Sequence, residues 1–370
     1  MTDARGTTVA QGFSNKLLLE MYDKSLLDQI CNRDYQGEIN DVGSKLNILN
    51  IARISEKTYT GADLSMDSLY ENNAVLEITE LKSFYWGEKT IDNFYSYIKN
   101  PHSTVVTQAA DERNMNMDTF ALGLYEDVAA GNRVGTDFTT GTVSIDADGI
   151  ATHSGTGFLE SMEGKGIKAT GHDKWYRVKD YLTTATLQLE DDLDDVTSDY
   201  TGGVITGATF TIEALTAVAV TTSNLLSKVA QMKLKLNKAQ ANSKSAVPTQ
   251  GRALIMPPEF ETLIINASGI ALHVPDVYTN LVQKGLFTML DGFMVFISNG
   301  LTGDNTNGYH CLAIHPNWLT FAEKLLSATM EEDLKGNFGS AYKDLFVYGG
   351  KVADSRRHFA AEGFFTFTIA

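Results

Sequence analysis

Seven histidines and one dense acidic run are the residues of this 370-residue chain best suited to bind a metal. The run, Glu190 to Asp195, offers the carboxylate oxygens that calcium prefers. An EF-hand loop also needs a central glycine and a distal glutamate, and neither occurs here at the required spacing. We therefore expect a solvated acidic turn, with calcium binding left open as the alternative. The histidines are scattered without metal-ligand spacing at His102, His153, His172, His273, His310, His315 and His358.

Sequence motifs of enzymes are missing from the chain. It has no P-loop, no nucleophile elbow and no HExxH zinc motif. The glycine-containing stretch Gly155–Gly166 lacks the spacing of a dinucleotide-binding fingerprint. We therefore predict a protein that is not an enzyme, with no catalytic residues, no bound metal and no cofactor.

Charge and composition restrict the compartment and the partners. Lys and Arg total 30 against 46 Asp and Glu, a net charge of −16, which excludes a general nucleic-acid binder. Cys31 and Cys311 are the only cysteines, so a reducing cytoplasm is the expected place of folding. No apolar run approaches the ~18 residues of a membrane span, and the first residues lack a signal-peptide core.

The longest predicted element is a helix over residues 100–131, around which the other elements must be placed. Pro101 suits the first helical position, and Asn100 before it suits the N-cap. Gly131 is a natural stop in the left-handed conformation. About 30 residues at 1.5 Å per residue make a rod of roughly 45 Å. Side chains recur at helical spacing at Val106, Ala109, Arg113, Met117, Phe120, Leu124 and Val128.

Two segments ahead of this helix need a partner to cover them. The spacing of Leu19, Tyr22 and Leu26 predicts an amphipathic helix over residues 15–31. Two strands, Lys45–Ile54 and Ala74–Trp86, flank a polar, exposed loop. A β-arm of this kind cannot bury itself within its own subunit, so either it is a flexible excursion or a neighbouring subunit holds it.

Residues 132–213 differ from the rest in composition. They are rich in Gly, Thr and Asp and hold fourteen acidic and six basic residues, half the net charge of the chain. Asp148-Gly149 marks a hairpin turn. We predict a small all-β domain, a sandwich or barrel, inserted between helices. Four strands are predicted within it: Thr142–Ile145, Lys174–Val178, Ala185–Leu189 and Thr209–Ile212.

Beyond this insert the pattern becomes helical again over Leu215 to Lys244. The helix carries Lys228, Lys233, Lys235 and Lys238, which could meet phosphate or form an ordinary solvated face. A buried strand ends at Pro257, a short helix covers Glu259–Asn266, and a hairpin turns at Asp291-Gly292. Tyr309–Ile314 is a further strand, followed by glycine-punctuated strands and loops.

The order of these elements resembles the major capsid proteins of tailed bacteriophages, whose Hong Kong 97 fold is shared with encapsulins. Residues 132–213 lie outside the resemblance. Each motif is weak alone, and their order carries the likeness. The motifs are Thr58–Asp63 in the exposed loop, Val247–Arg252 before the buried strand, Leu290–Val295 at the hairpin, and Val347–Val352 near the end.

The resemblance implies an α+β capsid fold with an inserted β domain. The implied divisions are an N-terminal arm (1–40), an extended loop (41–88), a peripheral domain with the spine helix (89–131 and 312–370), the insert (132–213) and an axial domain (214–311). Arm and loop would contact neighbouring subunits through Leu19, Tyr22, Leu26, Tyr59, Thr60, Gly61, Ala62, Asp63, Leu64 and Leu69.

The resemblance also implies what the protein assembles with. It implies self-assembly into hexamers and pentamers that enclose double-stranded DNA, with portal and scaffolding proteins as partners and no membrane. The shell would assemble in the host cytoplasm and become the virion capsid. An encapsulin-like compartment and a tail or decoration protein remain alternatives, and the DNA content of purified particles distinguishes the compartment from the capsid.

Overall fold

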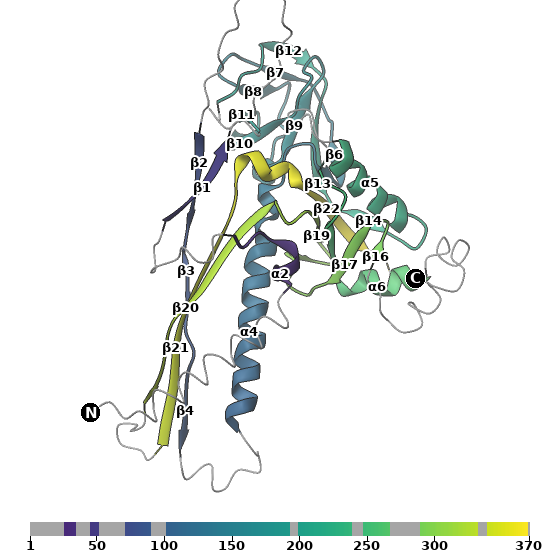
Figure 1. Ribbon diagram of the computed structural model, residues 1–370. Coiled ribbons are helices and arrows are strands. Elements are labelled where there is room, and N and C mark those ends of the chain that lie inside the picture. Colours follow the sequence, from purple (N-terminus) through teal and green to yellow (C-terminus); the bar gives the residue numbers. More distant parts are fainter. Residues whose placement is uncertain are drawn as a thin grey trace, which may run out of the picture. The chain divides into compact units, whose positions relative to one another are not determined.

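The computed structural model in Figure 1 describes residues 26–34, 45–51, 71–89, 101–192, 199–238, 247–266, 289–331 and 339–368. The chain forms two compact units, which are described one at a time. The first unit combines residues 1–47, 75–121 and 319–351. The second combines residues 48–74, 122–318 and 352–370.

The two strands predicted ahead of the spine helix are present. β1 (Lys45–Ile51) and β2 (Glu71–Glu77) pair in a two-stranded sheet, and the connection between them lies outside the described residues. The second prediction was too long, because its residues are divided among β2, β3 (Glu80–Lys82) and β4 (Tyr85–Lys89). Between β3 and β4, the Phe84 N–H donates to the Asp344 carboxylate at 2.8 Å instead of to a strand neighbour.

The spine helix α4 (Pro101–Gly123) starts at the predicted proline but is shorter than predicted. After Gly123 the chain tightens into the 3-10 turn η2 (Leu124–Asp127), and Gly131 has the expected positive φ of 87°. Glycine is a poor helix former, which favours an end near Gly123. The apolar pattern continues past the helix because Val128 is buried in the turn that follows.

The short helix α2 (Leu27–Ile30) is the described part of the helix predicted over residues 15–31.

The first unit packs α4 against a sheet built on two long strands, β20 (Leu319–Glu331) and β21 (Gly339–Val352). β3 and β4 both pair with β21 in antiparallel register. Figure 1 shows α4 running alongside these strands. Phe120 of α4 meets Tyr348 edge-on, with ring centroids 5.5 Å apart, and also contacts Phe321. The apolar face read from the sequence is therefore the face that meets the sheet.

In the second unit, residues 136–216 form an eight-stranded sheet. Fourteen buried side chains make a hydrophobic cluster within it. The predicted hairpin at Asp148-Gly149 is confirmed, because β7 and β8 pair across it. In spatial order the strands are β12 (Ile205–Ala208), β7 (Val143–Ile145), β8 (Ile150–His153), β11 (Thr186–Asp191), β10 (Tyr176–Thr183), β9 (Gly166–Ala169), β13 (Phe210–Thr216) and β6 (Thr136–Phe138).

The second sheet of this unit is mixed, and the 3-10 turns η3 (Glu160–Met162) and η4 (Asp354–Phe359) lie outside it. β15 (Ala253–Met256) is buried along its whole length and stops directly before Pro257, the proline predicted to end it. The sheet order is β14 (Val218–Val220), β22 (Ala360–Phe367), β19 (Gly308–Ile314), β15 (Ala253–Met256), β17 (Phe293–Ile297) and β16 (Met289–Leu290), with β5 (Arg133–Val134) pairing with β22 and β18 (Gly303–Asp304) with β19.

Among the described residues of the second unit, the α-helices that follow the insert are α5 (Leu225–Lys238) and α6 (Pro258–Asn266). The prediction that a helix starts at Leu215 was wrong. Residues 218–220 pair in parallel with Phe365–Phe367 instead, because their β-branched side chains suit a sheet. Asn224 then helps to begin the helix, since its side chain accepts a hydrogen bond from the Thr221 N–H at 2.8 Å.

Candidate functional site

Most of the predicted inter-subunit residues lie outside the described residues. This holds for Leu19, Tyr22, Tyr59 to Leu64, and Leu69. Leu26 is described, is partly buried and directly precedes α2. The predicted contacts of the arm and the extended loop therefore remain predictions.

The four lysines predicted to face DNA have different surroundings along α5. Lys235 donates to the Gly131 carbonyl at 2.8 Å, and Lys233 lies 2.5 Å from the Asp291 carboxylate. Lys228 contacts the Gln231 side chain at 3.4 Å, and Lys238 is exposed at the helix end. Of these four lysines, Lys228 and Lys238 therefore have most of their charge available to an external phosphate.

The described part of the acidic run, residues 190–192, bonds to the protein's own donors. Asp191 is 2.7 Å from the Lys174 ammonium, and Glu190 is 3.9 Å from the Arg177 guanidinium. Asp192 accepts the Ala130 N–H at 2.6 Å. The structure therefore favours a structural role for these three carboxylates over calcium binding. Across the part of the chain that the structure describes, no group of three or more His, Cys, Asp or Glu residues could hold a metal ion.

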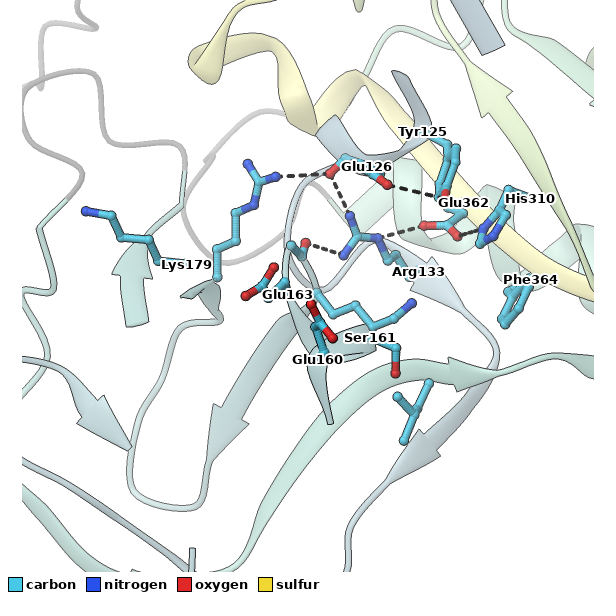
Figure 2. Close-up of a pocket in the computed structure, with 14 residues that line it drawn as sticks. Tyr125, Glu126, Arg133, Glu160, Ser161, Glu163, Lys179, His310, Glu362 and Phe364 are labelled. Atoms are coloured by element: carbon cyan, nitrogen blue, oxygen red, sulfur yellow. Dashed lines mark hydrogen bonds and ion pairs between the residues drawn. The ribbon is translucent and has the colours of Figure 1, made fainter. Parts of the chain in front are cut away.

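A polar cavity of about 540 Å³ lies where the insert meets the mixed sheet (Figure 2). Its walls come from η2, β5, η3, β10, β13, β19 and β22, all within the second unit. Both signs of charge line it, so it has no clear preference for anions or cations. Its charged and aromatic lining includes Tyr125, Glu126, Arg133, Glu160, Glu163, Lys165, Arg177, Lys179, His310, Glu362 and Phe364.

Arg133 is the central residue of this site. Its guanidinium is buried and contacts four different segments of the chain. Nη1 donates to the Gly164 carbonyl at 2.6 Å, and Nη2 donates to the Glu126 carbonyl at 2.9 Å. Nε lies 2.7 Å from the Glu362 carboxylate of β22. Arg133 therefore ties the start of the insert to the mixed sheet.

Glu213 performs the same task at the other end of the insert. Its buried carboxylate accepts the N–H groups of Gly131 at 2.8 Å and Gly166 at 3.0 Å. The Arg133 guanidinium is 3.8 Å away. Burial raises the pKa of Glu213, while Arg133 and Lys235 oppose that shift. The two ends of the insert thus share one buried, hydrogen-bonded junction.

His310 completes the site from β19. Its ring is stacked between Tyr125 and Phe364, with centroid distances of 3.8 and 4.5 Å. Its Nδ1 lies 2.6 Å from the Glu362 carboxylate. Burial disfavours the charged form of Glu362, but the His310 hydrogen bond and the Arg133 charge outweigh it, so the pKa of Glu362 is lowered. These contacts join the charged groups to one another, which suits a rigid joint better than a reaction centre.

Sequence reasoning missed this joint. Glu213 and Glu362 are isolated acids within otherwise apolar strands, and that isolation was the available signal. A lone carboxylate in a buried strand needs a cation or several donors nearby. The identity of that cation could not be read from the sequence, because Arg133 and Glu362 are far apart along the chain.

Among the comparisons with known proteins, only the comparison with solved structures found matches, and these indicate the fold. No family model matches the sequence, and no curated protein is detectably similar to it. A solved structure from Mycobacterium phage Che8 is 16% identical, with a TM-score of 0.53 over 93% of this chain and 91% of that chain. The capsids of Cyanophage P-SCSP1u and Ralstonia phage GP4 are 12% and 11% identical, each with a TM-score of 0.51 over 92% of this chain and 87% of theirs. The chain therefore has the α+β fold of phage capsid proteins.

Proposed function

We propose that this chain is the major capsid protein of a tailed phage, a structural protein that self-assembles into the icosahedral shell around the double-stranded DNA genome. The observation that carries the proposal is the capsid fold, matched over 92% of the chain by two phage capsids. The amphipathic arm and the polar loop predicted from the sequence support it independently, because a neighbouring subunit could cover both.

The domains of the proposed capsid protein follow those of the Hong Kong 97 fold. Residues 1–40 form the arm and residues 41–88 the extended loop, both lying over neighbouring subunits. The spine helix belongs to a peripheral domain (89–131 and 312–370), and residues 214–311 form the axial domain of the hexamers and pentamers. β1 and β2 pair in a two-stranded sheet of their own, which supports the assignment of residues 41–88 as the extended loop.

The insert, residues 132–213, forms a β domain on the outer face of the shell. Its own hydrophobic cluster supports a separate core. Its net charge of −8 would be repelled by packaged DNA and would aid solubility on the outside. On the inner side, Lys228 and Lys238 neutralise phosphates without reading sequence. Scaffolding and portal proteins act with the shell during assembly in the host cytoplasm.

Electron microscopy of the purified, expressed protein tests the proposal. We expect closed shells or capsomers in the form of hexamers and pentamers. Monomers at every concentration and salt condition would contradict it. If closed particles form in infected cells, their DNA content separates a phage capsid from an encapsulin-like compartment.

The extended loop offers a more specific test. A variant lacking Thr58–Glu71 should give soluble, folded subunits or capsomers that do not close, because the loop is the clamp between neighbours. Circular dichroism establishes folding, and sedimentation velocity measures assembly. Normal shells from this variant would show that the loop does not clamp neighbouring subunits.

A further inference from the structure

The dipeptide Asn-Gly occurs twice in the chain, at residues 299–300 and 307–308. Because glycine has no Cβ, its backbone nitrogen can approach the side chain of the residue before it. An Asn-Gly pair is therefore where a backbone nitrogen most readily attacks a side-chain amide carbon, with loss of ammonia. Both asparagines are exposed, so the two pairs are matched in sequence and in access to water. They differ in the hydrogen bonds around them.

Asn307 is fixed in the turn between β18 and β19. Its side-chain amide donates to one Asp304 carboxylate oxygen at 2.9 Å, and its backbone N–H donates to the other at 2.7 Å. These hydrogen bonds lower the pKa of the Asp304 carboxyl, so it stays ionised and keeps accepting them. Gly308 pairs with Asp304, and a Cβ on Gly308 would lie 2.6 Å from the Phe364 ring, so its backbone is closely packed. Attack by the Gly308 nitrogen has to break these contacts.

Asn299 has much looser surroundings. It lies in the connection between β17 and β18, and its side chain makes no hydrogen bond to another described residue. The Gly300 N–H donates to the Ser298 hydroxyl at 3.1 Å. A hydroxyl so close in sequence is a local partner that can rotate away without disturbing the sheet. The Asn299 side chain and the Gly300 nitrogen can therefore reach each other with little loss of structure.

We propose that Asn299 is a site of spontaneous deamidation and that Asn307, followed by the same residue, is protected by Asp304. The Gly300 nitrogen gives its proton to a base in the solvent and bonds to Asn299 Cγ, and the side-chain nitrogen leaves as ammonia. Water then opens the resulting succinimide at one carbonyl to give aspartate, or at the other to give isoaspartate. The net change is the exchange of ammonia for water. The proposal does not depend on the capsid function.

Deamidation at Asn299 alters a short connection whose two ends are fixed. Before it, the Ser298 N–H donates to the Met256 carbonyl at 3.0 Å, and after it the His310 N–H donates to the Thr302 carbonyl at 3.0 Å. Both products add a negative charge, and isoaspartate also adds a methylene group to the backbone between these two anchors. We therefore expect the loop to change its charge and its path while β15 and β19 keep their positions.

Peptide mapping of the full-length protein tests the proposal. The protein is kept in warm, mildly alkaline buffer and sampled over several days. Chymotrypsin cleaves after Phe296, Leu301 and Tyr309, which places the two asparagines on separate peptides, residues 297–301 and 302–309. Mass spectrometry gives the deamidated fraction of each peptide, and a protein isoaspartyl methyltransferase labels the isoaspartate product. A sample digested at time zero measures the conversion caused by the digestion itself.

Asn299 should deamidate faster than Asn307 in the folded protein, by about tenfold or more, because Asn307 must first lose hydrogen bonds to a charged group. In urea the two rates should become similar, since the dipeptides are the same. Asp304→Ala should speed the deamidation of Asn307 and leave that of Asn299 unchanged. Asp146→Ala, which removes another exposed turn aspartate that accepts backbone N–H groups, is the matched control and should keep both parent rates.

Equal rates at the two asparagines of the folded parent protein, or a faster reaction at Asn307, would overturn the proposal. So would an Asn299 that stays intact in the folded protein but deamidates in urea. An Asn307 that is as well protected in Asp304→Ala as in the parent would exclude Asp304 as its protector. If Asp304→Ala does not fold, the comparison of the two asparagines in the parent protein decides alone.

Discussion

A buried ion pair joins the spine helix to the sheet of the first unit. Arg113 of α4 and Asp344 of β21 form an ion pair at 3.0 Å with side chains 1% and 0% exposed. The Arg113 guanidinium also lies over the Phe84 and Phe346 rings, 5.1 and 4.5 Å from their centroids. Its place in the apolar repeat of the spine helix was visible in the sequence. Its partner was not, because 231 residues separate the two.

Arg113→Met should destabilise the protein by about 3–5 kcal/mol, because it leaves the Asp344 carboxylate buried without its cation. The loss is measured as the shift in the urea unfolding midpoint of the first unit. Lys343→Gln, which breaks the exposed pair of Lys343 with Glu331, is the control and should cost less than about 1 kcal/mol. Equal shifts in the two variants would contradict the assigned role of Arg113.

In Glu362→Gln, the free energy of unfolding should fall less steeply at acid pH than it does in the parent protein. A carboxyl whose pKa is lowered on folding stabilises the fold above its unfolded pKa of ~4.3, and that stability is lost as pH falls through the folded pKa. The variant should be less stable near neutral pH because Arg133 and His310 lose an anionic partner. Urea unfolding at several pH values measures this. A variant that loses stability in acid as steeply as the parent would exclude Glu362 as the source.

At the scale of elements, alternation of apolar residues in the insert was the most reliable signal. It located four of the eight strands, including those with the buried pairs Tyr176/Val178 and Leu187/Leu189. The missed strands β6, β8, β9 and β12 are three or four residues long, and β7, which is equally short, was located through its alternating Val143 and Ile145. The spine helix was predicted too long because the buried turn that follows it continues its apolar pattern.

The position at which the insert is cut should decide whether the remaining chain folds. Gly135 and Ala214 are adjacent, since a Cβ on Gly135 would lie 2.7 Å from the Ala214 Cα. A short Gly/Ser linker replacing residues 136–211 keeps Arg133 and Glu213, and this variant should be soluble and folded. Replacing residues 132–213 removes both, leaves Glu362 without Arg133, and should lower the unfolding midpoint further.

The two linker variants differ by six residues, so comparing them isolates the junction from the loss of the β sheet. Thermal unfolding followed by circular dichroism compares them at one protein concentration. Equal midpoints would show that the Arg133–Glu213 junction contributes little. Aggregation of both variants would show that the strands of the insert are part of the main core.

At the scale of the whole molecule, the order of weak motifs indicated the capsid fold, and the buried junction that fixes the insert could not be foreseen. Order along the chain survives when identity falls to 11–16%, because packing tolerates substitution as long as the pattern of elements is kept. A junction built from Arg133, Glu213 and Glu362 is one solution among many. Its residues can be recognised only once the strands that carry them are brought together.

The last prediction concerns the outward position of the insert. A short epitope placed between Gly203 and Val204 should bind antibody on intact, DNA-filled particles. Val204 is 67% exposed, and a Cβ on Gly203 would meet no atom within 4 Å, so the site accepts added residues. The same epitope after Lys238, at the end of the lysine-bearing helix, is the matched control and should bind only after the particles are opened. Antibody binding to the second site but not the first on intact particles would reverse the proposed polarity of the shell.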